Sequence, residues 1–350
     1  MHKIPATIIT GFLGSGKTTI IRHLLQNNKR RRIAVLVNEF GEVGVDGEIL
    51  KDCQICEEGE NPENNIIELK NGCLCCTVQE EFYPSIEKLL ERRDSLDCIL
   101  IETSGLALPK PLIQAFKWPE IRNSTTVDGV VTVVDCEALT CGKFVSNLNS
   151  LTLQRDEDHN IEHETPIEEL FEDQLTCADL VLLTKCDLVD EKELSIIKNW
   201  LSSKLRNGVK IIACHQGKIN IDILLGFNAH VEENLESRPT HHDSEEHHHD
   251  DNINAVTIIT SKAYEPKILI NILSKLVENH EIYRIKGFIH VAHKPMRLIL
   301  QGVGNRFNTF YDRFWNFNEP KETKLVLIGN KLSKEKIEKE IQSFNSLQQK

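Results

Sequence analysis

The sequence predicts an α/β domain with a mostly parallel sheet, followed by a smaller α+β domain. Three observations carry this prediction. A glycine-rich loop stands near the N-terminus between a strand-like and a helix-like run. Apolar runs alternate with helical stretches up to about residue 226, as in doubly wound folds. Residues 240–251 contain no apolar side chain and cannot form a core. We therefore expect domains at 1–226 and 253–350, joined by a linker at 227–252.

Composition excludes several classes of protein. The 350 residues carry a net charge of −12, and the basic residues form no stripe with aromatic residues, so we expect no nucleic-acid partner. No apolar run approaches the roughly 18 residues that a membrane span needs. The chain enters its first strand without a signal peptide, which predicts a cytoplasmic protein. In that reducing compartment the 11 cysteines are expected to be metal ligands or buried packing residues and not disulfides.

The first element predicted is a strand at 6–10, followed by a loop and a helix at 19–25. The loop, Gly11–Thr18, fits the pattern G-x-x-x-x-G-K-[ST] in the strand–loop–helix context that this pattern requires. Its glycines allow backbone N–H groups to point at phosphate oxygens, Lys17 supplies a charge to the β- and γ-phosphates, and Thr18 supplies a hydroxyl to Mg²⁺. The sequence thus predicts a nucleoside triphosphate site. Its binding residues are expected to be Gly11, Gly14, Ser15, Gly16, Lys17, Thr18 and Thr19.

The remaining elements follow from periodicity. Continuous apolar runs, typical of strands buried on both faces, occur at 32–37, 98–101, 129–134 and 180–183. Helical patterns between them occur at 79–93 and 190–206, and 155–169 has the acidic composition of a surface insertion. Beyond the linker we expect strands at 255–259, 283–291, 297–301 and 324–328, with helices at 266–277 and 333–344.

An acidic residue ends the predicted strand at 98–101. Glu102 is expected near Mg²⁺ or its waters, and Gly105 is expected to sense the γ-phosphate through its N–H. The alternative is a strand-end carboxylate that only meets solvent. The candidate catalytic residues are therefore Lys17, Thr18 and Glu102.

The strand at 180–183 is followed by Thr184-Lys185-Cys186-Asp187. GTPases carry the pattern [NT]-K-x-D at this place in the domain. A carboxylate at Asp187 can accept both the N1–H and the 2-amino group of guanine, which adenine does not offer. Thr184, Lys185 and Asp187 therefore favour GTP over ATP.

Three thiols stand within four residues at Cys73, Cys75 and Cys76. Thiolates bind Zn²⁺, Co²⁺ and similar ions in tetrahedral geometry, and three ligands leave a fourth position open, which favours loading and release. Two alternatives remain: Cys53 and Cys56 complete a four-cysteine structural site, or the segment holds a reactive redox thiol. We interpret most of the other six cysteines as buried packing residues. The His- and acid-rich linker either binds divalent ions loosely or is a solvated spacer.

These motifs, in this order, resemble the CobW family of metal-handling GTPases. The resemblance also covers residues 38–46 as a first switch segment, Glu102–Gly105 as the second switch, and the region after the linker as a CobW C-terminal domain. Residues 105–111 and 163–175 are most similar to the branch linked to cobalamin biosynthesis.

The resemblance implies GTP-dependent supply of Co²⁺ for insertion into a corrin ring, with a client metalloprotein or a cobalt-inserting chelatase as partner. GTP and Mg²⁺ would order the cysteine loop, and hydrolysis would release the metal. One or more of Glu39, Glu42 and Asp46 would assist at the Mg²⁺ or the metal. Turnover is expected to be slow, because no arginine finger can be placed in the sequence. The alternatives are a Zn²⁺ chaperone of the same fold, a nucleotide-switched binding module with structural zinc, and a GTP-using enzyme that acts on a small molecule.

Overall fold

The computed structural model describes residues 3–28, 31–38, 66–69, 82–144, 167–225, 253–317 and 319–347. The chain divides into two compact units. The first comprises Lys3–Arg206 and Ile211–Gly226, and the second comprises Asn207–Lys210 with the chain from Phe227 onward. None of the described helices is long and apolar enough to cross a membrane.

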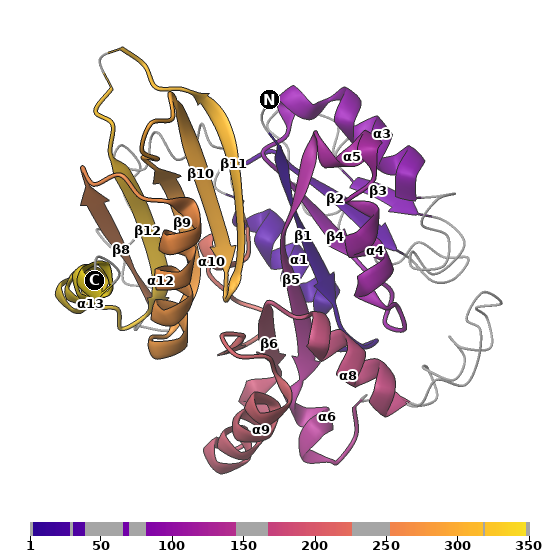
Figure 1. Ribbon diagram of the computed structural model, residues 1–350. Helices are drawn as coiled ribbons and strands as arrows, with labels where there is room; N and C mark the ends of the chain where they lie inside the picture. Colours follow the sequence, from indigo (N-terminus) through magenta and orange to yellow (C-terminus); the bar gives the residue numbers. More distant parts are fainter. Residues whose placement is uncertain are drawn as a thin grey trace. The chain divides into compact units, whose positions relative to one another are not determined.

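A seven-stranded sheet forms the first unit, in the order β3-β2-β4-β1-β5-β6-β7 (Figure 1). Every pairing from β3 to β6 is parallel. The strands are β1 (Ile4–Thr10), β2 (Ile33–Asn38), β3 (Ile66–Leu69), β4 (Cys98–Glu102), β5 (Thr125–Asp135), β6 (Leu180–Thr184) and β7 (Lys210–Ala213). Because β1, β4 and β6 are buried along their whole length, their sequences are nearly continuous apolar runs. The predicted α/β class is confirmed.

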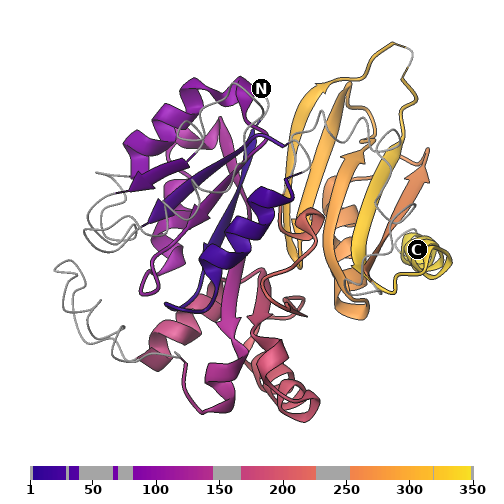
Figure 2. The same ribbon diagram turned by 180° about the vertical axis from the view of Figure 1, so that it is seen from behind.

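Helices cover both faces of this sheet (Figure 1, Figure 2). One face carries α1 (Lys17–Gln26), and the other carries α3 (Tyr83–Glu91) and α4 (Pro109–Ala115). The remaining helical segments of this unit are η3 (Arg93–Ser95), α5 (Pro119–Arg122), α6 (Cys136–Thr140), α8 (Ile167–Cys177), η4 (Cys186–Leu188), α9 (Glu191–Lys204) and α10 (Ile221–Leu224). The core under α3 and α4 joins Phe82, Ile86 and Leu112 to apolar side chains of β1, β2 and β4.

Helix boundaries differ from the sequence predictions for identifiable reasons. The helix expected from Asp190 begins at Glu191, because Asp190 is its N-cap: the Asp190 carboxylate accepts from the Glu193 N–H at 2.8 Å, and the Glu193 carboxylate accepts from the Asp190 N–H at 3.2 Å. The insertion expected at 155–169 lies outside the described residues up to 166, and 167–169 instead begin α8. The periodicity of apolar residues did not predict the short elements β3, β7, α4, α5, α6 and α10. Each spans too few residues to show a helical or strand period.

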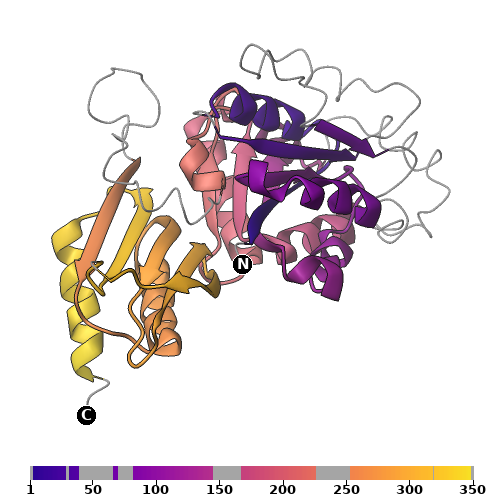
Figure 3. The same ribbon diagram turned by 90° about the horizontal axis from the view of Figure 1, so that it is seen from above.

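An antiparallel five-stranded sheet forms the second unit, in the order β11-β10-β9-β12-β8. Its strands are β8 (Ile253–Thr260), β9 (Ile282–Ile289), β10 (Met296–Val303), β11 (Arg306–Phe314) and β12 (Thr323–Asn330). Two helices, α12 (Pro266–Asn279) and α13 (Lys334–Leu347), share one core with the sheet, and α13 lies next to β8 (Figure 3). The expected α+β domain is confirmed, while β11 was missed because its side chains are half-exposed and mostly polar.

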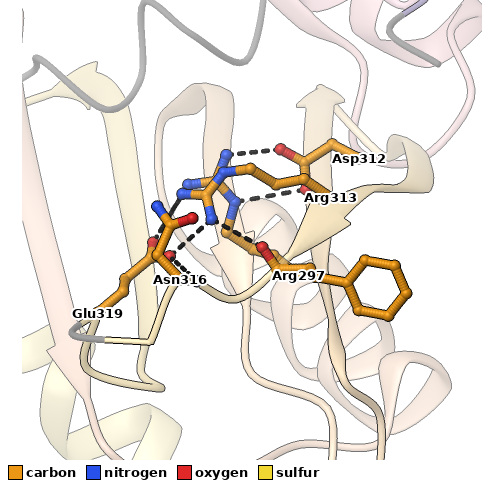
Figure 4. A network of polar contacts seen from close by, with 6 residues as sticks. Arg297, Asp312, Arg313, Asn316 and Glu319 are labelled. Carbon is orange, nitrogen blue, oxygen red and sulfur yellow. Dashed lines mark hydrogen bonds and ion pairs between the residues drawn. The ribbon is translucent and has the colours of Figure 1, made fainter.

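The other face of this sheet holds a polar network around the buried Arg297 (Figure 4). Arg297 is 1% exposed, and its guanidinium contacts the Asp312 carboxylate at 2.5 Å and the Glu319 carboxylate at 3.6 Å. Arg313 also reaches Glu319, with nitrogen–oxygen distances of 2.6 and 2.8 Å. These contacts hold the pKa of Glu319 below its usual value, against the opposing effect of its partial burial. Phe288 lies under the Arg297 guanidinium at 4.9 Å, so the network is charged, paired and packed on an aromatic ring.

Candidate nucleotide site

The glycine-rich loop adopts a conformation that only glycine tolerates at two points. Gly11 has φ 135°, and a Cβ there would lie 2.2 Å from the Val133 carbonyl oxygen of β5. Gly16 has φ 96° and is the N-cap of α1. No acidic residue stands in the first turn of α1, so the N-terminal end of the helix dipole suits an anion.

Lys17 lies back across this loop and is buried. Its ammonium donates to the Gly11 carbonyl at 2.8 Å and to the Phe12 carbonyl at 3.1 Å. The Ser15 hydroxyl oxygen is buried and has no hydrogen-bond partner among the described residues. A buried hydroxyl without a partner is costly, so this orphaned group fits a loop shaped around an anionic ligand.

Thr18 and Glu102 lie side by side at the carboxyl end of the sheet. The Thr18 hydroxyl donates to the Glu102 carboxylate at 3.1 Å. The end of β4 is fixed beside β1, because the Thr103 N–H donates to the Ile9 carbonyl at 3.0 Å and the Thr103 hydroxyl donates to Thr10 at 2.9 Å. A hydroxyl next to a carboxylate is an oxygen donor set that fits Mg²⁺.

Gly105 lies directly against the phosphate loop. A Cβ at Gly105 would be 2.5 Å from the main-chain nitrogen of Leu13, so a side chain there would collide with the loop. The turn 104–107 is closed by the Ala107 N–H, which donates to the Ser104 carbonyl at 3.1 Å. The structure thus brings the segment expected to sense the γ-phosphate into contact with the loop expected to hold it.

The motif expected to read the base is hydrogen-bonded to the glycine-rich loop. The Thr184 hydroxyl donates to the Ser15 carbonyl at 2.6 Å and approaches the Val134 carbonyl at 3.2 Å. Lys185 has φ 55°, and its ammonium pairs with the Asp135 carboxylate at 2.5 Å. Asp187 follows in η4 and is exposed, so its carboxylate is accessible to a base.

Three contributors to this site were not predicted from the sequence. Asp135, at the end of β5, holds Lys185; its position after an apolar strand, like that of Glu102, is the signal that could have identified it. Gln174 contacts the Gly105 turn from α8, and one glutamine in an amphipathic helix gives no signal. The turn at 215–218 reaches Thr19, since a Cβ at Gly217 would lie 2.9 Å from the Thr19 methyl group.

The buried cysteines of this unit are held as thiols. Burial raises the pKa of Cys136, and burial together with the neighbouring Cys136 raises the pKa of Cys186 to about 12. Cys177 is half-buried, and this partial burial also raises its pKa. Metal binding requires thiolates, so these side chains are poor ligands. Cys98 and Cys214 are buried too, in keeping with packing roles, whereas Cys141 is exposed.

The expected metal ligands lie outside the described residues. This holds for Cys73, Cys75 and Cys76, for the alternative pair Cys53 and Cys56, and for Glu39, Glu42 and Asp46. The linker histidines, 241–249, also lie outside them. Within the part of the chain that the structure describes, no group of three or more His, Cys, Asp or Glu side chains is placed to hold a metal ion.

Comparison with known proteins identifies the family. Residues 5–213 match the CobW/HypB/UreG nucleotide-binding domain, and residues 253–345 match the cobalamin synthesis protein cobW C-terminal domain. The chain belongs to the CobW family. The resemblance inferred from the motifs is therefore confirmed.

Relatives are similar over nearly the full chain. "Zinc chaperone CobW" of Pseudomonas aeruginosa is 50% identical over 98% of this chain and 92% of its own length. "Zinc chaperone CobW" of a Sinorhizobium species is 48% identical over 93% of each chain. "Zinc chaperone YjiA" of Escherichia coli is 30% identical over 96% of this chain and 97% of its own.

Proposed function

We propose that this protein is a GTP-dependent metal chaperone that loads a divalent ion on Cys73, Cys75 and Cys76 and releases it after GTP hydrolysis. The observation that carries the proposal is the nucleotide site in which Lys17, the Thr18–Glu102 pair and the Gly105 turn converge at one edge of the sheet. Family membership supports GTPase activity in general and a role in metal handling.

The chain's own residues divide the nucleotide chemistry between them. Lys17 and the N–H groups at the start of α1 would bind the phosphates, and Asp187 would select guanine. Thr18 and Glu102 would hold Mg²⁺, which supplies positive charge between the β- and γ-phosphates. Gly105 would report whether the γ-phosphate is present. Because no arginine finger can be placed from the sequence, we expect slow turnover.

The chain order favours coupling between the nucleotide and the cysteines. Cys73 stands four residues after Leu69, the last residue of β3, in the sequence. Since β3 is parallel to its neighbours, its carboxyl end shares an edge with the end of β1, where the phosphate loop begins. Metal ligands that follow β3 in the chain could therefore be ordered or released according to whether a γ-phosphate is bound.

Zn²⁺ is the proposed cargo. Three relatives at 30% to 50% identity carry the name zinc chaperone. Zn²⁺ also stands above Co²⁺ in affinity for sites of this kind. The expectation of Co²⁺ delivery for corrin synthesis stays a prediction. The client, whether a metalloprotein or a cobalt-inserting chelatase, would take the metal after hydrolysis.

Metal titration of the purified full chain tests this proposal. Co²⁺ serves as a spectroscopic probe, because thiolate ligation gives intense charge-transfer absorption. We expect this spectrum with Mg²⁺ and GTP, its decay as GTP is hydrolysed, and its displacement by Zn²⁺. Cys73→Ser, Cys75→Ser and Cys76→Ser should each abolish it, whereas Cys141→Ser, at an exposed cysteine elsewhere, should retain it.

Two outcomes would contradict the proposal. An equally strong spectrum with GDP would refute release on hydrolysis. Retention of the spectrum in the three serine variants would refute the ligand set. Removal of residues 240–251 is expected to eliminate weak metal sites only. If the tight site were lost on that deletion, its ligands would lie in the linker and not at the three cysteines.

A further inference from the structure

Helix α8 touches the nucleotide site at two points one turn apart. Phe171 and Gln174, spaced i and i+3, lie on the same face of the helix and are both buried. The Phe171 ring stacks on Phe12 of the phosphate loop, with centroids 6.0 Å apart and planes 6° apart. The same face thus supports the phosphate loop through an aromatic contact and reaches the Gly105 turn through Gln174.

The Gln174 side chain is fully buried and bonds to that turn. Its amide nitrogen donates to the Gly105 carbonyl at 3.2 Å and to the Ala107 carbonyl at 3.3 Å. Both partners can only accept, so the NH₂ end of the amide must face them and its orientation follows from the network. These two bonds satisfy the amide nitrogen, while Gln174 Oε1 is buried without a hydrogen-bond partner among the described residues.

The main chain of α8 at Gln174 is also bonded to the sheet. The Thr132 hydroxyl of β5 donates to the main-chain carbonyl of Gln174 at 3.0 Å, which fixes the helix against the sheet. The Gly105 turn accepts two hydrogen bonds from Gln174 and lies against the phosphate loop, since a Cβ at Gly105 would be 2.5 Å from the Leu13 nitrogen. The two bonds to its carbonyls restrict how the turn presents its N–H groups.

We propose that Gln174 is a positioning residue for γ-phosphate recognition: it holds the Gly105 turn where that turn can distinguish GTP from GDP. The inference rests on the proposed use of GTP and on the expected contact of Gly105 with the γ-phosphate. It is independent of the metal cargo, so the experiment is done without Zn²⁺ or Co²⁺.

The test measures the affinities of Gln174→Leu for GDP and for the slowly hydrolysed analogue GTPγS, with Mg²⁺, in the full chain. Leucine has a similar volume but donates no hydrogen bond. We expect GDP affinity within threefold of wild type, GTPγS affinity reduced about tenfold, and kcat for GTP reduced at least tenfold. Should Gln174→Leu fail to fold, Gln174→Asn keeps a buried amide that is too short to reach the turn. It should reduce GTPγS affinity at least threefold, again with little change for GDP.

Thr176→Val is the matched control, because it removes an exposed side-chain bond on the same helix and keeps the Gln174 amide and its contacts. It should leave the GTPγS-to-GDP affinity ratio within twofold of wild type. A parallel fall in both affinities in the Gln174 variants, or the same loss in Thr176→Val, would mean that Gln174 has only a structural role and would overturn the proposal. A wild-type protein that binds GTPγS and GDP equally would overturn it too. A failed metal titration with intact nucleotide discrimination would instead count against the chaperone function alone.

Discussion

Two buried cations, one in each unit, differ in the groups that contact them, and we expect one to serve binding and the other to serve stability. Lys17 donates to two main-chain carbonyls of its own loop, which are neutral groups that solvate an ammonium without cancelling its charge. Arg297 contacts the carboxylates of Asp312 and Glu319, which do cancel its charge. Main-chain carbonyls do not neutralise a cation, whereas carboxylates do, and the carboxylates at Arg297 tie its charge to the second unit.

The comparison is tested most severely at Lys17. Lys17→Ala should lower GTP affinity about a thousandfold, or about 4 kcal/mol, because the charge directed at the β- and γ-phosphates is lost. Fluorescence titration with a labelled GTP analogue measures this. Lys204→Ala removes an exposed lysine paired with Glu172 and should bind GTP as wild type does. GTP hydrolysis retained in rigorously purified Lys17→Ala would refute a conventional phosphate loop.

Arg297 should show the reverse behaviour. Arg297→Met leaves the partly buried carboxylates of Asp312 and Glu319 without their shared cation and should reduce the free energy of unfolding of the second unit by about 3 kcal/mol, with GTP affinity unchanged. Hydrogen exchange at β9 and β10 reports the loss. Lys334→Met breaks an exposed pair with Glu338 and should cost less than about 0.5 kcal/mol. If Arg297→Met were as stable as wild type but bound GTP more weakly, Arg297 would serve binding and not stability, contrary to this prediction.

The smallest effect is expected at a buried neutral group, the Cys186 thiol. Its pKa is raised to about 12, so the folded state retains a proton that the unfolded chain releases near pH 9. The stabilisation is complete below pH 9 and declines as the pH rises toward 12, by about 1 kcal/mol between pH 8 and 10. Denaturant unfolding at several pH values measures the slope. Cys186→Ala should flatten it and Cys141→Ala should not; equal slopes in both variants would contradict the assignment.

The sequence predicted the parts of the fold that have a strong period or a fixed spacing. The buried strands β1, β4, β5 and β6 were recognised because burial on both faces makes a strand continuously apolar. The glycine-rich motif and the acidic residue at a strand end predicted Lys17, Thr18 and Glu102 as site residues. In the structure Lys17 lies back across the loop, and Thr18 is hydrogen-bonded to Glu102. The second unit was recognised as a separate α+β domain because residues 240–251 interrupt the apolar pattern.

Elements and contacts that depend on tertiary structure could not be predicted in this way. β11 pairs with β10 through main-chain bonds while its side chains stay half-exposed, so its sequence shows no apolar face. Asp135 and Gln174 act on residues 50 and 69 positions away, and no local pattern encodes such partners. The roles of Cys73, Cys75 and Cys76 remain predictions, since these residues lie outside the described part of the chain.

The bond from Thr184 to the Ser15 carbonyl has a consequence for kinetics. It joins the loop expected to read the base to the loop expected to bind the phosphates, with 2.6 Å between the hydroxyl and carbonyl oxygens. If both loops contact a nucleotide as proposed, this bond would couple their movements. We therefore expect the two loops to open together, which would make nucleotide exchange slow even where equilibrium binding is modest.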